Sequence, residues 1–119
     1  MSKVRIKVEI KNSEENNLRE VDAIISDSKL KYKEEENTTV VFSYLDKTLV
    51  RENNELRMDY TFDLNKETIG RIYIKELNKK LEIKIKTTKL KIENNDIEVS
   101  FIVEDNKFNY KVEVIKWVY

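Results

Sequence analysis

Few residue types in this chain could do chemistry. The 119 residues include no cysteine and no histidine, which removes thiol catalysis, Ser-His-Asp and Cys-His arrangements, and the usual zinc ligands. A pair of carboxylates acting as general acid and base is the common catalytic arrangement that this composition still allows. No second group can be assigned to such a pair, so we expect no catalytic residues and a protein that is not an enzyme.

The acidic residues show no spacing that would suit a metal ion. Calcium loops place acidic or amide side chains at every second position, and no such D-x-D-x-D run occurs in the chain. We therefore expect neither a bound metal nor a cofactor.

One charged residue is a candidate for the interior of the protein. Residues 48–52 alternate as a short strand, so that Leu49 and Arg51 share one face while Val50 and Glu52 share the other. The pattern leaves open which face is buried, and therefore whether Arg51 or Glu52 points inward. The charge either reaches solvent at the strand end or anchors the polar end of a ligand, because an unpaired buried charge is costly.

Seven aromatic residues fall on positions that are predicted to face inward. They are Phe42, Tyr44, Tyr60, Phe62, Phe101, Phe108 and Tyr110. These rings either fill the core or line a pocket for a small hydrophobic or amphipathic molecule. Together with Arg51 they form our set of candidate pocket residues. Stacking on nucleic-acid bases would need outward rings interleaved with basic residues, and the parity of these rings argues against it.

The elements that carry these residues are predicted to be β-strands. Apolar and polar residues alternate in nine to ten short runs, separated by polar turns at spacings of about 8–12 residues. Residues 18–26 also show a helical spacing of Leu18, Val21 and Ile25, but their Val and Ile content favours a strand. We expect one all-β domain over residues 1–119 with little or no helix. Short connections predict an antiparallel up-and-down β-barrel of about eight to ten strands.

Residues 70–92 form the longest patterned stretch and contain Gly70, the one glycine of the sequence. The apolar positions are odd-numbered from Leu81 through Ile85 and even-numbered from Leu90 to Ile92. A shift of one residue would turn the buried side chains outward. We therefore predict a β-bulge or a sharp bend at residues 87–89.

Asparagine pairs punctuate the pattern elsewhere. Asn53 and Asn54 separate two strand-like runs. Because asparagine tolerates a positive φ better than most residues, we predict a two-residue type I′ hairpin there.

Charge is balanced overall but uneven along the chain. Lys plus Arg and Asp plus Glu are equal at 23 each, and this balance argues against a nucleic-acid-binding protein. Residues 75–91 carry seven lysines against two glutamates, whereas residues 14–36 carry eight acids against four bases. Such runs either solvate outer faces or form a patch for a partner of opposite charge. The lysine face of residues 75–91 is therefore a candidate interaction surface.

Trp117 and Tyr119 give the chain a short apolar tail. The two rings either close one end of the barrel or form a homodimer contact, since an exposed tryptophan favours a partner. The sequence contains neither the apolar segment of a signal peptide nor a run of membrane-spanning length. We expect a cytoplasmic protein without a membrane partner.

The order of these runs resembles that of the YwiB-like family, small bacterial β-barrels with a calycin (lipocalin-like) fold and no assigned activity. The resemblance covers nearly the whole chain, and it rests on residues 4–10, 41–46 (VFSYLD), 60–62 (YTF), 77–90 (LNKKLEIKIKTTKL) and 97–114. Asn78-Lys79-Lys80 stands where the family has a Pro-Tyr-Gly-like turn, and Asp27-Ser28 stands where the family has a glycine. The family has no agreed catalytic residues, so the resemblance implies a fold and no activity.

Two functions follow as expectations. The first is a non-enzymatic barrel that binds a small hydrophobic or amphipathic ligand. The alternative is a structural or interaction protein that acts through its outer surface, at the lysine face of residues 75–91 or at the Trp117 end.

Overall fold

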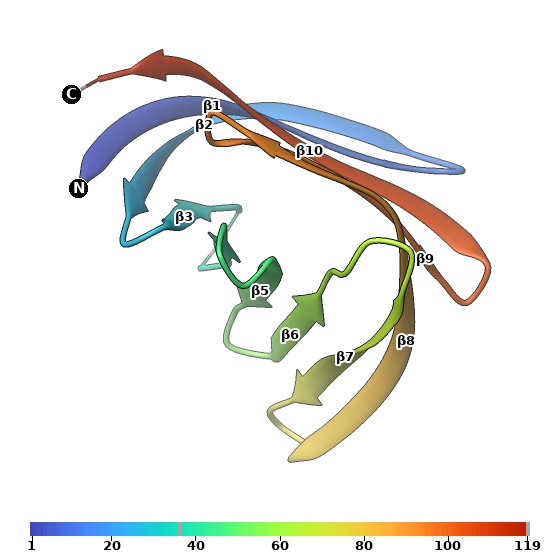
Figure 1. The fold of residues 1–119 in the computed structure, drawn as a ribbon. Coiled ribbons are helices and arrows are strands. Elements are labelled where there is room, and N and C mark those ends of the chain that lie inside the picture. Colours follow the sequence, from blue (N-terminus) through green and yellow to red (C-terminus); the bar gives the residue numbers. More distant parts are fainter. Residues whose placement is uncertain (36, 119) are drawn as a thin grey trace.

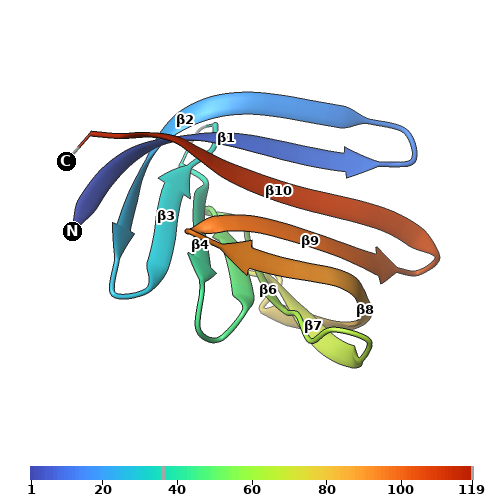
Figure 2. The ribbon, with the colours of Figure 1, turned by 45° about the horizontal axis from the view of Figure 1, so that its top comes forward.

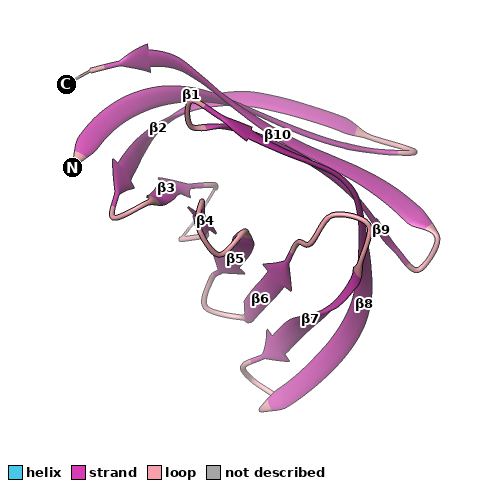
Figure 3. Ribbon diagram, viewed as in Figure 1, coloured by secondary structure: helices cyan, strands magenta, loops and turns pink. Residues whose placement is uncertain are grey.

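Alternating apolar and polar residues form strands along almost the whole chain. The structure, a computed structural model, describes residues 1–35 and 37–118, which form ten strands and no helix (Figures 1 and 3). The strands are β1 (Ser2–Asn12), β2 (Asn16–Ser26), β3 (Lys29–Lys33), β4 (Thr39–Ser43), β5 (Thr48–Glu52), β6 (Leu56–Thr61), β7 (Glu67–Ile74), β8 (Lys79–Glu93), β9 (Asp96–Val103) and β10 (Asn106–Trp117). The prediction of an all-β chain is confirmed, and residues 18–26 lie in β2. No helix long and apolar enough to cross a membrane is found in the described residues.

Each strand pairs with its neighbour in the sequence, and the first strand pairs with the last. The order β1-β10-β9-β8-β7-β6-β5-β4-β3-β2 makes a closed barrel in which all neighbours are antiparallel. The two ends of the chain lie side by side (Figure 1), where the Val118 N–H donates to the Lys3 carbonyl oxygen at 2.8 Å. The β1–β2 and β9–β10 hairpins extend well past the short strands β3 and β4 (Figure 2). The predicted up-and-down barrel is confirmed.

Three hairpins turn on two residues that both have a positive φ. They are closed by Asp27-Ser28, Asn94-Asn95 and Glu104-Asp105. Positive φ at both central residues is the geometry of type I′ turns, whose twist matches that of the flanking strands.

The predicted type I′ turn at Asn53 and Asn54 is wrong. Neither residue has a positive φ, and the loop between β5 and β6 is one residue longer than predicted. The side-chain Oδ1 of Asn53 accepts hydrogen bonds from the Glu55 and Leu56 N–H groups at 2.8 and 2.9 Å. This Asx turn replaces the backbone turn because a short amide side chain can satisfy donors two and three residues ahead.

The inner face of the barrel holds a continuous apolar core. Its fully buried members come from β1, β3, β4, β8, β9, β10 and the residue after β6, and they include Ile6, Leu30, Phe42, Phe62, Ile85, Val99 and Val112. Removal of this surface from water is the main favourable term for folding, at about 25 cal/mol per Å² of apolar area.

The predicted irregularity at residues 87–89 is confirmed as a shift in the β8–β9 register. Thr87 faces inward and is fully buried, the next two residues are both exposed, and Leu90 faces inward again. Thr87 also holds the β6–β7 connection, because its Oγ1 accepts from the Asp63 N–H and its carbonyl oxygen accepts from the Asn65 N–H. The extra residue shifts the inward positions from odd to even numbers, so that apolar residues still face inward after it, and it bends the strand.

Gly70 is required by close packing and not by its φ, which is not positive. It lies on the inner face of β7, opposite Ile83 of β8. A Cβ atom at this position would lie 2.6 Å from Ile85 Cδ1, 3.1 Å from Tyr60 Cδ1 and 3.2 Å from Ile83 Cγ1. The missing side chain therefore makes the space into which the Tyr60 and isoleucine side chains pack.

We predict that Gly70→Ala lowers the free energy of unfolding by about 1–3 kcal/mol, because the added methyl group overpacks the inner face. Urea denaturation followed by circular dichroism measures the change. Arg71→Ala, at the exposed neighbouring position, is the control and should cost much less. Equal losses in the two variants would show that the packing around Gly70 is not the constraint.

Candidate ligand-binding site at one end of the barrel

The register of β5 decides which charge faces the interior. Leu49 pairs with Phe42 and with Tyr60, both of the inner face, so Arg51 also points inward. Glu52 points outward, where its carboxylate lies 2.8 Å from the Lys75 Nζ. The alternative left open by the sequence is therefore settled in favour of Arg51.

Arg51 forms a close ion pair with Glu34. The Arg51 Nε donates to Glu34 Oε1 at 2.7 Å, and the Arg51 Nη2 lies 2.6 Å from the same oxygen. The side chain of Glu34 is 10% exposed, whereas that of Arg51 is 52% exposed. Glu34 is positioned by the β3–β4 hairpin, in which its N–H donates to the Thr38 carbonyl oxygen at 2.8 Å. Charge-assisted bonds of this kind are among the stronger hydrogen bonds in proteins.

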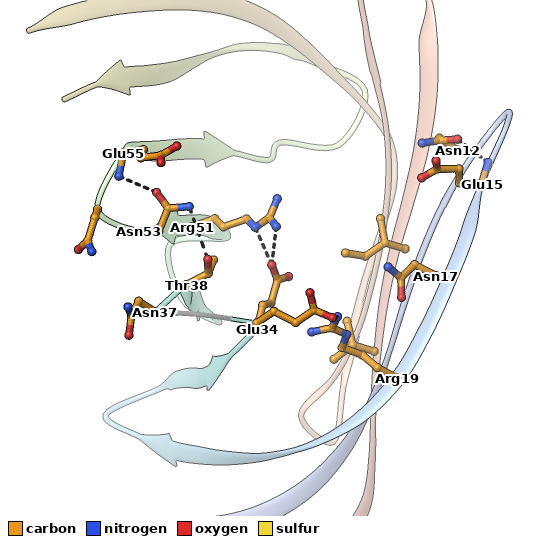
Figure 4. A pocket seen from close by; sticks show the side chains of 14 residues that line it. Asn12, Glu15, Asn17, Arg19, Glu34, Asn37, Thr38, Arg51, Asn53 and Glu55 are labelled. Atoms are coloured by element: carbon orange, nitrogen blue, oxygen red, sulfur yellow. Dashed lines mark hydrogen bonds and ion pairs between the residues drawn. The ribbon is translucent and has the colours of Figure 1, made fainter. Parts of the chain in front are cut away.

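This ion pair lies in a cavity of about 780 Å³ at one end of the barrel. Three hairpin turns surround it, namely β1–β2, β3–β4 and β5–β6. Residues of the β1–β2 hairpin lie on one side of the cavity and those of the β5–β6 turn lie on the other, with Arg51 and Glu34 between them (Figure 4). The lining consists of Val8, Ile10, Asn12, Glu15, Asn17, Arg19, Glu34, Glu35, Asn37, Thr38, Arg51, Asn53, Asn54 and Glu55.

A second arginine lines the same cavity. Arg19 pairs in register with the inward-facing Val8, and its Nη2 lies 3.2 Å from Glu35 Oε1. Neither Arg19 nor Glu34 was among the pocket residues predicted from the sequence. The alternation of the strand could have indicated Arg19, because Arg19 lies two residues before the inward-facing Val21 and therefore on the same face.

Two buried tyrosines lie next to the charged groups on the inner face. The hydroxyl oxygens of Tyr32 and Tyr110 are 2.7 Å apart, and both side chains are buried. Burial raises the pKa of Tyr32, and the negative charge of Glu34 raises it further. Burial and the nearby Tyr32 also raise the pKa of Tyr110 well above its usual value. Both hydroxyls therefore stay protonated at neutral pH and act as hydrogen-bonding groups.

The predicted aromatic residues pack mainly against one another. Ring centroids are 5.1 Å apart for Phe62 and Phe101 and 5.4 Å apart for Phe101 and Phe108. Tyr44 stacks edge-on against Phe42 at 5.8 Å, and its hydroxyl donates to the Asn95 carbonyl oxygen. Of the eight candidate pocket residues, Arg51 alone contributes to the lining of the cavity. The seven rings thus form the aromatic core beside the site.

An apolar strip continues from Arg51 across the inner face. In register, Arg51 pairs with Met58, Met58 with Ile72, and Ile72 with Leu81. These three apolar residues are only partly buried, and Leu81 is 46% exposed. They also lie outside the cluster that packs around the core. A charged pair and an accessible apolar strip are therefore adjacent on the same inner surface.

The lysine face lies on the outer surface of β8, and the apolar tail lies at the end of β10. On β8, Lys84 and Lys86 are exposed, and Lys89 lies 3.1 Å from Glu98, which holds the pKa of that carboxyl below its usual value. Trp117 is 51% exposed and pairs in register with Val4 of the inner face, at one end of the barrel. Tyr119 lies outside the described residues.

No metal centre is found among residues 1–35 and 37–118, since no group of three or more acidic side chains could hold an ion there. The acids of the cavity are instead distributed around its wall.

These features define the class of protein as a closed, ten-stranded, up-and-down β-barrel with a charged cavity at one end. No protein-family model matches the chain, and no curated protein matches its sequence. Among solved structures, the crystal structure of the YwiB protein from Bacillus subtilis is similar, with a TM-score of 0.59 and 16% sequence identity. The match covers 95% of this chain and 90% of that one. At this identity it shows a common fold, and the predicted YwiB-like barrel is confirmed at that level.

The buried phenols predict a loss of stability in alkali. Burial raises the pKa of Tyr44 to about 12 in the folded protein, whereas an unfolded tyrosine ionises near pH ~10. The protonated Tyr44 hydroxyl therefore contributes fully to the free energy of unfolding below about pH 10, and this contribution is lost as the pH rises toward about 12. Urea midpoints measured across this range should fall, and the fall should be shallower in Tyr44→Phe. An unchanged slope in that variant, compared with Tyr73→Phe on the outer face, would contradict this assignment.

Proposed function

We propose that this chain is a non-enzymatic, calycin-like barrel of the YwiB-like family that binds a small amphipathic molecule at the open end of the barrel. In this proposal it works in the cytoplasm of a bacterium, as the resemblance to that family implies. The observation that carries the proposal is the position of the Arg51–Glu34 ion pair inside a cavity of about 780 Å³. A volume of this size suits a small organic ligand.

The proposed ligand has a polar end and an apolar end, because an apolar strip that lies outside the cavity lining is next to Arg51 in the strand register. The polar end would lie at Arg51 and Glu34, where hydrogen-bonding groups converge. The apolar end would lie along Met58, Ile72 and Leu81, which are accessible on the inner face. Covering partly exposed apolar side chains is favourable by about 25 cal/mol per Å².

The packing of the aromatic core supports a ligand at the mouth and not in the centre of the barrel. The rings of Phe62, Phe101 and Phe108 are in mutual contact, so a ligand in the centre would have to separate them. The mouth requires no such rearrangement.

A neutral fluorescent probe, N-phenyl-1-naphthylamine, tests the proposed function. We expect saturable binding in the parent protein and a roughly tenfold loss of affinity in Ile72→Ser, because the hydroxyl replaces an apolar contact on the inner wall. Ile69→Ser, on the outer face of the same strand, should bind like the parent protein. Amide shifts in a ¹⁵N NMR titration should centre on Arg51, Glu34 and Met58. Absence of saturable binding, or equal affinities in the two variants, would contradict the proposal.

A second candidate function uses the exposed apolar residues at the end of β10. Ile115, Trp117 and Val118 are each about half exposed, at 44%, 51% and 50%. Three adjacent exposed apolar residues favour a contact with another protein surface, and a second copy of this chain is the simplest partner.

Sedimentation velocity tests this second candidate. A homodimer through the tail predicts a concentration-dependent dimer that Trp117→Ser weakens by about tenfold or more, while Leu77→Ser at the exposed β7–β8 turn leaves it unchanged. A monomer at all concentrations, or equal effects of the two substitutions, would exclude the tail as a dimer contact.

A further inference from the structure

Most of the turns at the open end of the barrel are acidic. The β1–β2 turn contributes Glu14 and Glu15, the β5–β6 turn contributes Glu55, and the β9–β10 turn contributes Glu104 and Asp105. These turns lie at the same end of an up-and-down barrel, because each follows an odd-numbered strand. The β7–β8 turn lies at the same end and carries Lys75 beside Glu76, so acids still outnumber bases among these turns. The rim therefore presents a negative potential to an approaching ligand.

The lining of the cavity has the same sign. Two arginines face four glutamates, Glu15, Glu34, Glu35 and Glu55, so the lining carries two more negative than positive charges. Each arginine already has an acidic partner, since Arg51 pairs with Glu34 and Arg19 with Glu35. Among the described residues no ion pair joins Glu15 or Glu55 to a base. The uncompensated charges of the cavity are thus carboxylates.

A nearly buried carboxylate in the cavity retains capacity for another donor. The side chain of Glu34 is nine-tenths buried, and both of its contacts with Arg51 end on Oε1. A carboxylate oxygen accepts more than one hydrogen bond. Among the residues that the structure describes, no hydrogen bond or ion pair reaches Oε2, so a donor that enters the cavity can bond there. This feature is independent of the surrounding acidic turns, and it points to a ligand that donates.

We propose that the polar end of the ligand is a cation, a protonated amine or a related ammonium group. This inference rests on the proposed function, because it specifies the head group of the molecule bound at the mouth. An ammonium group carries only donors, which match Glu34 Oε2 and the carboxylates of Glu15 and Glu55. An anionic head would meet an excess of negative charge and would have to displace Glu34 from Arg51.

Three amphiphiles with the same ten-carbon chain separate the possibilities. Isothermal titration calorimetry with decylammonium, decanol and decanoate, each below its aggregation limit, compares a cationic, a neutral and an anionic head group. We expect decylammonium to bind about tenfold or more tighter than decanoate, with decanol between them, because each exposed ion pair contributes up to about fivefold. Added NaCl should weaken decylammonium binding and leave decanol unchanged.

Substitutions at the rim locate the effect. The double variant Glu15→Gln with Glu55→Gln should weaken decylammonium by about fivefold and leave decanol unchanged. Its matched control is Glu20→Gln with Glu67→Gln, two exposed positions outside the cavity lining, which removes the same net charge. Glu34→Gln should lower the affinity for decylammonium and raise that for decanoate, since Arg51 is then free to pair with an anion. Thermal melts followed by circular dichroism confirm that each variant is folded.

The outcomes distinguish the two levels of the proposal. Binding of decanoate as tight as that of decylammonium, or equal effects of the rim variant and its control, would overturn the cationic head group and leave the binding function standing. Failure of all three amphiphiles to bind would overturn the binding function, and the inference about the head group with it.

Discussion

The antiparallel pairing of β1 with β10 is the interaction on which the rest of this structure depends. All other neighbouring strands are joined by short turns, whereas this pair joins the two ends of the chain. It places Ile6 opposite Val114 and Val8 opposite Val112, all on the inner face. Without it the sheet would have two open edges, each with unpaired backbone groups. Closure also surrounds the inner face with wall on every side, which makes a core and a cavity out of a curved sheet.

The interior of the barrel has an apolar part and a polar part, because the inward-facing residues change from apolar to charged toward one end. The inward side chains proceed from Tyr32 of β3 to Glu34 just after that strand, and along β5 they proceed from Leu49 to Arg51. The same change occurs along β2, where Arg19 follows Val21 in the inward parity. The apolar part of the inner face packs into a solid core, and the polar part remains open to water. The cavity and the core thus lie on the same inner face, which is charged at the cavity and apolar in the core.

The long, bent strand β8 supplies the curvature that this arrangement needs. Its inward parity changes between Thr87 and Lys89, and the fully buried Thr87 fixes the adjacent loop through two hydrogen bonds. Gly70, on the neighbouring strand, allows Tyr60 to lie close against the inner wall. Both features were visible in the sequence, the first as a change of parity and the second as an isolated glycine.

The candidate site was harder to predict than the fold. Binary patterning assumes that inward residues are apolar, and this assumption fails where the inside of a barrel is wet. Glu34 and Arg19 therefore read as ordinary surface residues, although their parity is inward. The aromatic residues were placed on the correct face, but the sequence could not show that their rings pack together. The Asn53-Asn54 turn was mispredicted because the capping ability of the Asn53 side chain competes with its tolerance of positive φ.

The sequence by itself determined the strands, their inward faces, the bulge in β8 and the absence of histidine and cysteine chemistry. These properties follow from local alternation and from composition, which need no knowledge of distant residues. Tertiary structure alone decided whether Arg51 or Glu52 faces the interior, because Leu49 and Val50 are equally suited to a core. The pairing of β5 with β4 and β6 places Leu49 on the inner face, and therefore Arg51 as well. Tertiary structure also brought Arg51, Glu34 and Arg19, from three separate strands and turns, to the wall of one cavity.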